Sequence, residues 1–131
     1  MDISPVTTTY STDDNSWMGS EHGTDCTLSI TLDLTAGFVA GTHYPDGYLK
    51  SGLPLGKITA SGKYGLYDDA AVDGRTTLVG FLYGGVKVGS TTAVPVGAAL
   101  LWHGVVRQSR LPTPGVDANG KTDVANKILF I

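Results

Sequence analysis

Glycine interrupts this chain so often that little room is left for a helix. There are 18 glycines among 131 residues, about twice the usual share. No window places apolar residues at the i, i+3, i+4 and i+7 spacing of an amphipathic helix without an internal glycine. The glycines have no fixed period and separate short runs of β-branched residues. This pattern predicts a small, turn-rich, mostly β domain.

The clearest strand is expected at residues 27–34. Its apolar residues, Leu28, Ile30, Leu32 and Leu34, alternate strictly with polar ones. Alternation with a period of two predicts a strand that is buried on one face only. The next segment, residues 35–47, contains Gly37, Gly41 and a Pro-Asp-Gly triplet and is expected to be a loop.

Further strands are expected in the second half of the chain. Pro54 has no N–H to donate, so the segment around it is expected at a sheet edge or as a crossing segment. Residues 75–83 and 86–88 flank a Gly-Gly pair and predict a hairpin. Residues 93–106 are apolar almost throughout, which predicts a strand buried on both faces, with another backbone close to Gly97-Ala98-Ala99.

Both ends of the chain differ from its middle. Residues 1–26 are polar and are expected to form a flexible arm in front of a β-rich domain at 27–131. Within the arm Trp17 and Met18 either fold back onto the body or anchor a partner, and both interpretations stay open. From about residue 107 a loose C-terminal extension is expected, with one short helix in 117–126 and with residues 128–131 paired into a sheet of this chain or of a neighbour.

Composition excludes several classes of function. The net charge is −3 and the nine Lys and Arg residues are scattered, which argues against direct binding of nucleic acid. Charged residues make up only 16% of the chain, so either partners cover part of the surface or the surface is neutral and rich in Thr and Ser. Cys26 is the only cysteine, which excludes an internal disulfide and favours a reducing compartment. Neither a signal peptide nor a membrane span is expected.

The sequence contains no recognisable catalytic or metal-binding set. Ser20, Glu21 and His22 are adjacent but lie in the polar arm, and His103 follows Trp102 in an apolar run. The aspartates at 68, 69 and 73 lack the alternating oxygen ligands and the distal Glu of a calcium loop. We therefore expect a protein that is not an enzyme and that has no cofactor and no metal.

An ordered set of short motifs resembles a known family. These motifs are Lys50–Ile58, Tyr64, the Asp73-Gly74-Arg75 turn, Val79–Leu82 and Val96–Leu100. Taken together they resemble the head decoration proteins of tailed bacteriophages, the family that includes the phage lambda decoration protein. The resemblance covers about residues 28–106.

The resemblance implies a fold, a location and partners. It implies a β-clip or β-tulip-like domain that forms a homotrimer and binds the outside of the expanded phage head at threefold positions. There the protein would stabilise the shell against internal DNA pressure, after synthesis in the host cytoplasm. The N-terminal arm would become ordered on the shell and pair with the major capsid protein.

The expected interface residues fall into two sets, for each of which ordinary core packing stays open as the alternative. Capsid contacts are expected from Val6, Thr7, Thr8, Thr9, Tyr10, Trp17 and Met18. Trimer or shell contacts are expected from Pro54, Leu55, His103, Phe130 and Ile131. For Leu55 and Phe130 core packing is the equal or better interpretation.

Two other functions remain as alternatives. One is a virion-surface binding module for carbohydrate or host surface, in which Tyr44, Tyr48 and Trp102 are the candidate aromatics. The other is a trimeric nucleotide hydrolase of the dUTPase type, with Asp69, Asp73 and Arg75 at subunit junctions. The ordered motifs of such a hydrolase are not visible in the sequence.

Overall fold

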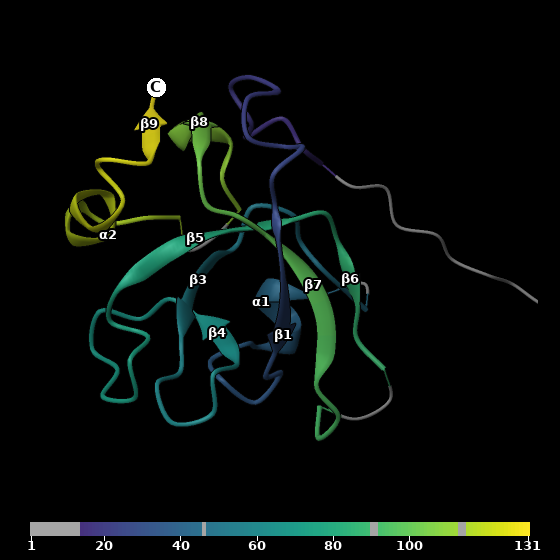
Figure 1. The fold of residues 1–131 in the computed structure, drawn as a ribbon. Coiled ribbons are helices and arrows are strands. Elements are labelled where there is room, and N and C mark those ends of the chain that lie inside the picture. The colour runs from purple at the N-terminus through teal and green to yellow at the C-terminus, as the bar shows by residue number, and fades with distance from the viewer. Residues whose placement is uncertain (1–13, 46, 90–91, 113–114) are drawn as a thin grey trace, which may run out of the picture.

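A closed five-stranded barrel forms the centre of the molecule (Figure 1). The computed structural model describes residues 14–45, 47–89, 92–112 and 115–131. Around the barrel the strand order is β1-β4-β3-β5-β7, with β1 and β4 parallel and the other neighbours antiparallel. The strands are β1 (Leu28–Leu32), β3 (Pro54–Lys57), β4 (Tyr64–Leu66), β5 (Leu78–Tyr83) and β7 (Val96–Leu101).

Two small sheets and short helices complete the fold. β2 (Tyr48–Leu49) pairs antiparallel with β6 (Val86–Lys87), and β8 (Gly104–Val106) pairs parallel with β9 (Ile128–Phe130). The helices are α1 (Ala40–His43), the 3₁₀ turn η1 (Gln108–Arg110) and α2 (Ala118–Asp123). In Figure 1, β8, β9 and the C-terminus lie together at one end of the barrel.

The predicted mostly β fold class is confirmed, and the structure specifies it as a mixed closed barrel. The β-clip or β-tulip name stays a prediction. Among the described residues, no helix is long and apolar enough to cross a membrane.

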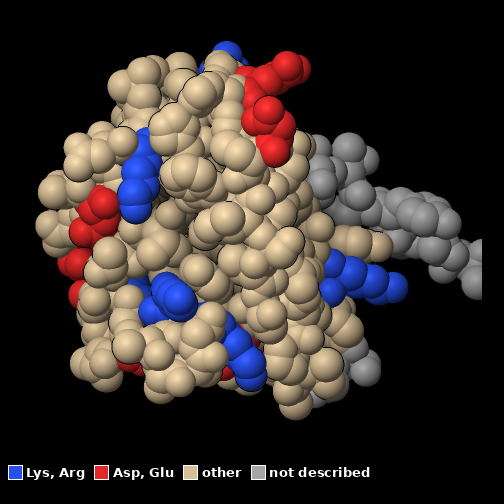
Figure 2. All heavy atoms as spheres, in the orientation of Figure 1, with Lys and Arg blue, Asp and Glu red and all other residues tan. Residues whose placement is uncertain are grey.

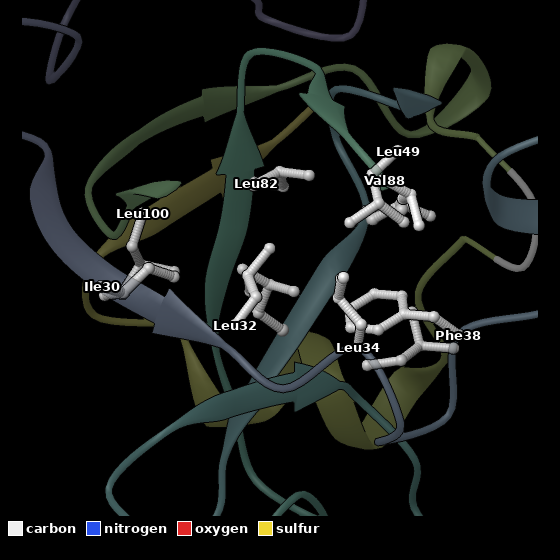
Figure 3. Packing of buried hydrophobic residues seen from close by; sticks show 11 residues of the cluster. Ile30, Leu32, Leu34, Phe38, Leu49, Leu82, Val88 and Leu100 are labelled. Carbon is white, nitrogen blue, oxygen red and sulfur yellow. The ribbon is translucent and has the colours of Figure 1, made fainter. Parts of the chain in front are cut away.

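The inside of the barrel is filled by leucine-rich strand faces (Figure 3). In β1, Ile30 and Leu32 point inward, and Leu34 continues the buried face beyond the end of the strand. The predicted alternation is therefore confirmed, although Leu28 at the start of the strand is 50% exposed. The expected loop at 35–47 contains α1, which holds a buried His43 against Phe38.

A second apolar cluster joins the barrel to the β8–β9 sheet. Because neighbouring strand residues point to opposite faces, β5 and β7 contribute to both clusters. Leu82 and Leu100 lie in the barrel cluster, whereas Phe81 and Leu101 lie in the second one. The full second cluster is Trp17, Tyr67, Leu78, Phe81, Leu101, Val106, Val124 and Ile128.

The C-terminal segment is packed, which corrects the expectation of a loose extension. Val124 and Ile128 are almost completely buried in the second cluster. The short helix expected in 117–126 is confirmed as α2, and the expected pairing of the chain end is confirmed for Ile128–Phe130 in β9.

The expectation that Pro54 marks an edge or crossing segment is wrong. β3 lies between β4 and β5 in the closed barrel. Pro54 is the first residue of β3, and its carbonyl accepts a hydrogen bond of 3.0 Å from the N–H of Tyr67, just beyond the end of β4. A proline is tolerated at the start of a strand, because its missing donor interrupts no ladder there.

The predicted hairpin of 75–83 with 86–88 is also wrong. β5 already has β3 and β7 on its two edges, so β6 pairs with β2 instead. The apolar run at 93–106 is divided between β7 and β8, which belong to different sheets. A Cβ at Gly97 would meet no atom of the described residues within 4 Å, whereas one at Gly80 would lie 2.4 Å from the carbonyl oxygen of Leu101. The predicted segment Gly97–Ala99 does have a backbone beside it, that of β1, but a side chain would collide with a neighbouring backbone at Gly80 and not at Gly97.

Candidate interaction surface

Residues 17–19 add a third member to the β8–β9 sheet. The N–H of Gly19 donates to the carbonyl of Val105 at 2.8 Å, and the N–H of Arg107 donates to the carbonyl of Trp17 at 2.6 Å. Met18 lies opposite Val106 in an antiparallel bridge. The described part of the predicted arm, residues 14–26, is thus attached to the body. The expected contacts Val6, Thr7, Thr8, Thr9 and Tyr10 lie outside the described residues.

Trp17 is a core residue in this structure. It is 0% exposed, and its ring centroid lies 5.7 Å from that of Phe81. Met18 is half-buried and packs against the same cluster. Of the two interpretations left open by the sequence, the structure shows the one in which both residues fold back onto the body.

The small sheet has an apolar outer face. Along β9, Ile128 faces the core, whereas Leu129 is 62% exposed and Ile131, just after the strand, is 57% exposed. Val105 is half-buried and is the register partner of Leu129. A Cβ at Gly19 would lie 2.5 Å from Val105 Cγ1 and 3.1 Å from Ile131 Cδ1. Because position 19 is glycine, the side chains of Val105 and Ile131 can lie over the segment 17–19. We call Gly19, Val105, Leu129 and Ile131 the outer face.

The charged side chains are spread thinly over the surface. Figure 2 shows that most of the face in view is made of uncharged residues, with Lys, Arg, Asp and Glu in a few small groups. Depletion of charge together with exposed apolar side chains is typical of the centre of a protein–protein interface. The outer face thus has the composition of a contact surface for another protein.

The other predicted trimer or shell contacts lie in different surroundings. Pro54 and Leu55 are buried, so for both the structure shows core packing. Phe130 is half-buried and packs edge-on against Phe81 at 6.1 Å. His103 lies between β7 and β8, beside His22. Among these candidates Ile131 has the largest exposed apolar surface.

Sequence reasoning missed Val105 and Leu129 as surface candidates. The apolar chain end did contain a signal for Leu129. Successive side chains of a strand point to opposite faces, so four consecutive apolar residues cannot all point into the core. What was missing was the partner strand β8, since its pairing decides which of the four face outward.

Two of the three aromatic residues predicted for a carbohydrate site pack against the body of the protein. Tyr44 and Trp102 are partly buried against the barrel cluster, and the indole N–H of Trp102 donates to the carbonyl of Cys26 at 2.8 Å. Their rings are therefore used at least in part for packing within the chain.

The acidic residues of the imagined hydrolase are engaged in structural contacts. Asp73 accepts from Nε of Arg75 at 3.0 Å, and Asp69 accepts from the amide of Asn119 at 2.8 Å. Asp69 and Arg75 line one hollow of about 530 Å³ together with Asp117. Within the described part of the chain, no three His, Cys, Asp or Glu side chains gather as a metal site.

Asp117 in the same hollow serves as a helix cap. It accepts from the backbone N–H of Gly120 and from the hydroxyl of Tyr67, both at 2.8 Å. These bonds hold the pKa of Asp117 below its ordinary value, the Gly120 bond most. Burial, followed by the bond to Asp117, raises the pKa of Tyr67. The pair stays as a neutral phenol and a carboxylate, which suits a structural hydrogen bond.

Comparison with known proteins identifies the family. No individual curated protein matches the chain at significant similarity. The family described as bacteriophage lambda head decoration protein D matches residues 33–129, which is most of the chain. The chain therefore belongs to the bacteriophage lambda head decoration protein D family, and is thus a structural, non-catalytic protein of the capsid surface of a phage head.

Proposed function

We propose that the protein binds the outside of the expanded phage head at threefold positions as a homotrimer and stabilises the shell against internal DNA pressure. Family membership supports a role on the capsid. The observation that carries the proposed mode of contact is the outer face, on which Leu129 and Ile131 remain more than half exposed. A free apolar face of this kind is stabilised when a protein partner covers it.

The outer face is continuous with the N-terminal part of the chain. Residues 17–19 form one edge of the same sheet, and the described part of the chain begins three residues before them, at residue 14. We propose that Val6–Tyr10 contact the major capsid protein, with Met18, Leu129 and Ile131 as neighbouring contacts. An extended segment that adds to a sheet edge gains main-chain hydrogen bonds without needing a rigid pocket.

The energetic role follows from mass action. A protein that binds only the expanded shell lowers the free energy of that state and leaves the unexpanded state unchanged. A trimer placed over a threefold junction multiplies weak single contacts, because after the first contact the others form at high effective concentration.

The test is co-sedimentation with expanded heads assembled from the major capsid protein of the same phage. The full chain and a chain lacking residues 1–13 are compared, because this deletion leaves Trp17 in the core. We expect the full chain to bind and the shortened chain to bind weakly or not at all. Light scattering after size exclusion gives the mass, with the trimer expected near three times 13.6 kDa.

Two results would contradict the proposal. If the full chain fails to bind expanded heads, the cement function is wrong. If the shortened chain binds as well as the full chain while both keep the same unfolding temperature, the role of residues 1–13 is wrong.

A further inference from the structure

Two histidines that are far apart in sequence meet at the surface. Nε2 of His22 and Nδ1 of His103 share a hydrogen bond of 2.9 Å, in which one imidazole donates and the other accepts, and their ring centroids are 4.8 Å apart. His22 is exposed and His103 is half-buried. The pair lies where the segment 14–26 passes the connection between β7 and β8.

The fold holds the two backbones together on both sides of the pair. A Cβ at Gly23 would lie 1.9 Å from the carbonyl oxygen of His103, and one at Gly104 would lie 2.7 Å from that of His22. Both glycines have positive φ, +88° and +154°, so a residue with a side chain is disfavoured at either position. The approach of the two histidines is therefore built into the main chain.

The rings themselves also have fixed neighbours. The backbone N–H of His22 donates to Ser20 Oγ at 3.1 Å, which sets the turn before the ring. The ring of His103 lies 5.6 Å from that of Trp102, whose indole N–H is bound to the carbonyl of Cys26. The His103 ring is therefore held by its neighbours, whereas the exposed His22 ring, whose one ring contact among the described residues is with His103, can turn to share a ligand with it.

We propose that His22 and His103 are the two protein ligands of a surface site for a borderline transition-metal ion such as Zn²⁺ or Ni²⁺. Imidazole nitrogen is the protein ligand that suits these ions. With metal–nitrogen bonds of about 2.0–2.1 Å, two ligands are about 2.9 Å apart at a right angle and about 3.4 Å apart at a tetrahedral angle. The observed 2.9 Å lies at the lower end of this range, and the metal ion would take the place of the proton that the two nitrogens share, which is released to solvent.

The surroundings leave room for the remaining ligands. An open hollow of about 290 Å³ is lined by both histidines and by residues 125–129. Water can complete the coordination from this side, as it does for many exposed ions. Lys127 is a cation in the same lining, but it is exposed, so solvent screens its repulsion.

Metal binding at this place would have a structural consequence. It would tie the segment 14–26 to the β7–β8 connection and so stabilise the folded chain by an amount that grows with the logarithm of metal concentration above the dissociation constant. This effect does not depend on capsid binding, so it can be measured on the isolated protein.

The experiment is thermal unfolding of the full chain with ZnCl₂, with MgCl₂ at equal ionic strength as the control. We expect Zn²⁺ at about ten times its dissociation constant to raise Tm by about 3 °C or more, and Mg²⁺ to leave it unchanged. His22→Ala and His103→Ala should each abolish the rise. Cys26→Ser is the matched control, because it removes the nearby exposed thiol and should keep the rise.

A second measurement keeps the proposal testable if an alanine variant does not fold. The chain has three histidines, so the ring ¹⁵N resonances of the unchanged protein can be followed during titration with ZnCl₂. We expect Nε2 of His22 and Nδ1 of His103 to shift, and the buried His43 to stay in place as an internal reference. The proposal is overturned if Tm does not rise, if the rise survives in both histidine variants, if Cys26→Ser removes it, or if neither ring responds.

Discussion

The indole N–H of Trp17 donates a hydrogen bond of 3.1 Å to the hydroxyl of Ser51, 34 residues away. The same hydroxyl accepts from the backbone N–H of Gly84 at 3.1 Å and donates to Oδ1 of Asn15 at 2.6 Å. Ser51 thereby uses its one donor and both acceptor positions. The side chain connects the N-terminal segment, the turn before β3 and the end of β5 within the buried part of the molecule.

This arrangement predicts that Ser51→Ala is costly. The substitution leaves the buried indole N–H of Trp17 without its partner, which costs about 1–3 kcal/mol. Urea unfolding measures the loss as a lower midpoint. Ser61→Ala is the control, because Ser61 also accepts a backbone N–H but lies in an exposed turn, where a change within about 0.5 kcal/mol is expected. Equal losses in the two variants would show that the buried network contributes little.

The contrast between Gly80 and Gly97 gives a second prediction. A Cβ at Gly80 would lie 2.4 Å from the carbonyl oxygen of Leu101, so Gly80→Ala forces β5 and β7 apart and should cost about 1–3 kcal/mol or more. Gly97 in β7 has open space at the same position, so Gly97→Ala should be neutral or stabilise by up to about 1 kcal/mol. Thermal unfolding of both variants measures the difference, with the lower Tm expected for Gly80→Ala. A lower Tm for Gly97→Ala than for Gly80→Ala would contradict the close approach at Gly80.

Local sequence patterns predicted the strands better than their partners. The alternation at 27–34 shows which face of β1 is buried, because a strand that is buried on one side needs that alternation. The pairing of β6 with β2 could not be found in this way, since it depends on both edges of β5 being occupied by distant strands. The Gly-Gly pair at 84–85 suggested a hairpin because a turn signal is local, whereas barrel closure is not.

The candidate surface was predictable only in part. Ile131 was expected from the apolar chain end, but Leu129 needed the register with Val105. Trp17 was placed in a polar arm because its neighbours in sequence are polar. Its burial results from contacts with Ser51 and Phe81, which lie far along the chain. Whether a large side chain such as Trp17 in a polar segment is buried therefore depends on tertiary contacts, and local composition does not reveal it.

Asp117 predicts a specific change of stability with pH. Its hydrogen bonds lower its pKa in the folded state, so the folded state is favoured above the unfolded value of about 3.9. That contribution is lost as the pH falls through the lower, folded pKa. Asp117→Asn keeps an oxygen for Gly120 and Tyr67 but does not titrate. Its stability should therefore fall less than that of the unchanged protein between about pH 4 and pH 2.

Urea midpoints from pH 6 to pH 2 measure this difference. Hydrogen bonds from the side chains of Ser16 and Thr35 also lower the pKa values of Asp14 and Asp33. The unchanged protein and Asp117→Asn should therefore both still lose stability in acid. The effect of Asp117 should be modest, since its carboxylate is exposed and solvent screens it. Parallel curves for the two proteins over the whole range would show that the capping carboxylate makes no pH-dependent contribution.

The proposed contact of the outer face with the shell gives the last prediction. Leu129→Glu places a charge on the apolar outer face, where a partner would have to remove its water. We expect binding to expanded heads to weaken by about tenfold or more, which corresponds to a loss of about 1.4 kcal/mol or more. Val94→Glu is the matched control, because Val94 is 60% exposed, against 62% for Leu129, and lies in the segment before β7.

The comparison separates the surface from the fold. Both side chains are mostly in solvent, so both variants should keep their unfolding free energy within about 0.5 kcal/mol. A selective loss of shell binding in Leu129→Glu then locates the contact at the β8–β9 end of the molecule. Equal binding by both variants would remove the outer face from the interface. A loss in Val94→Glu alone would place the contact near the start of β7 instead.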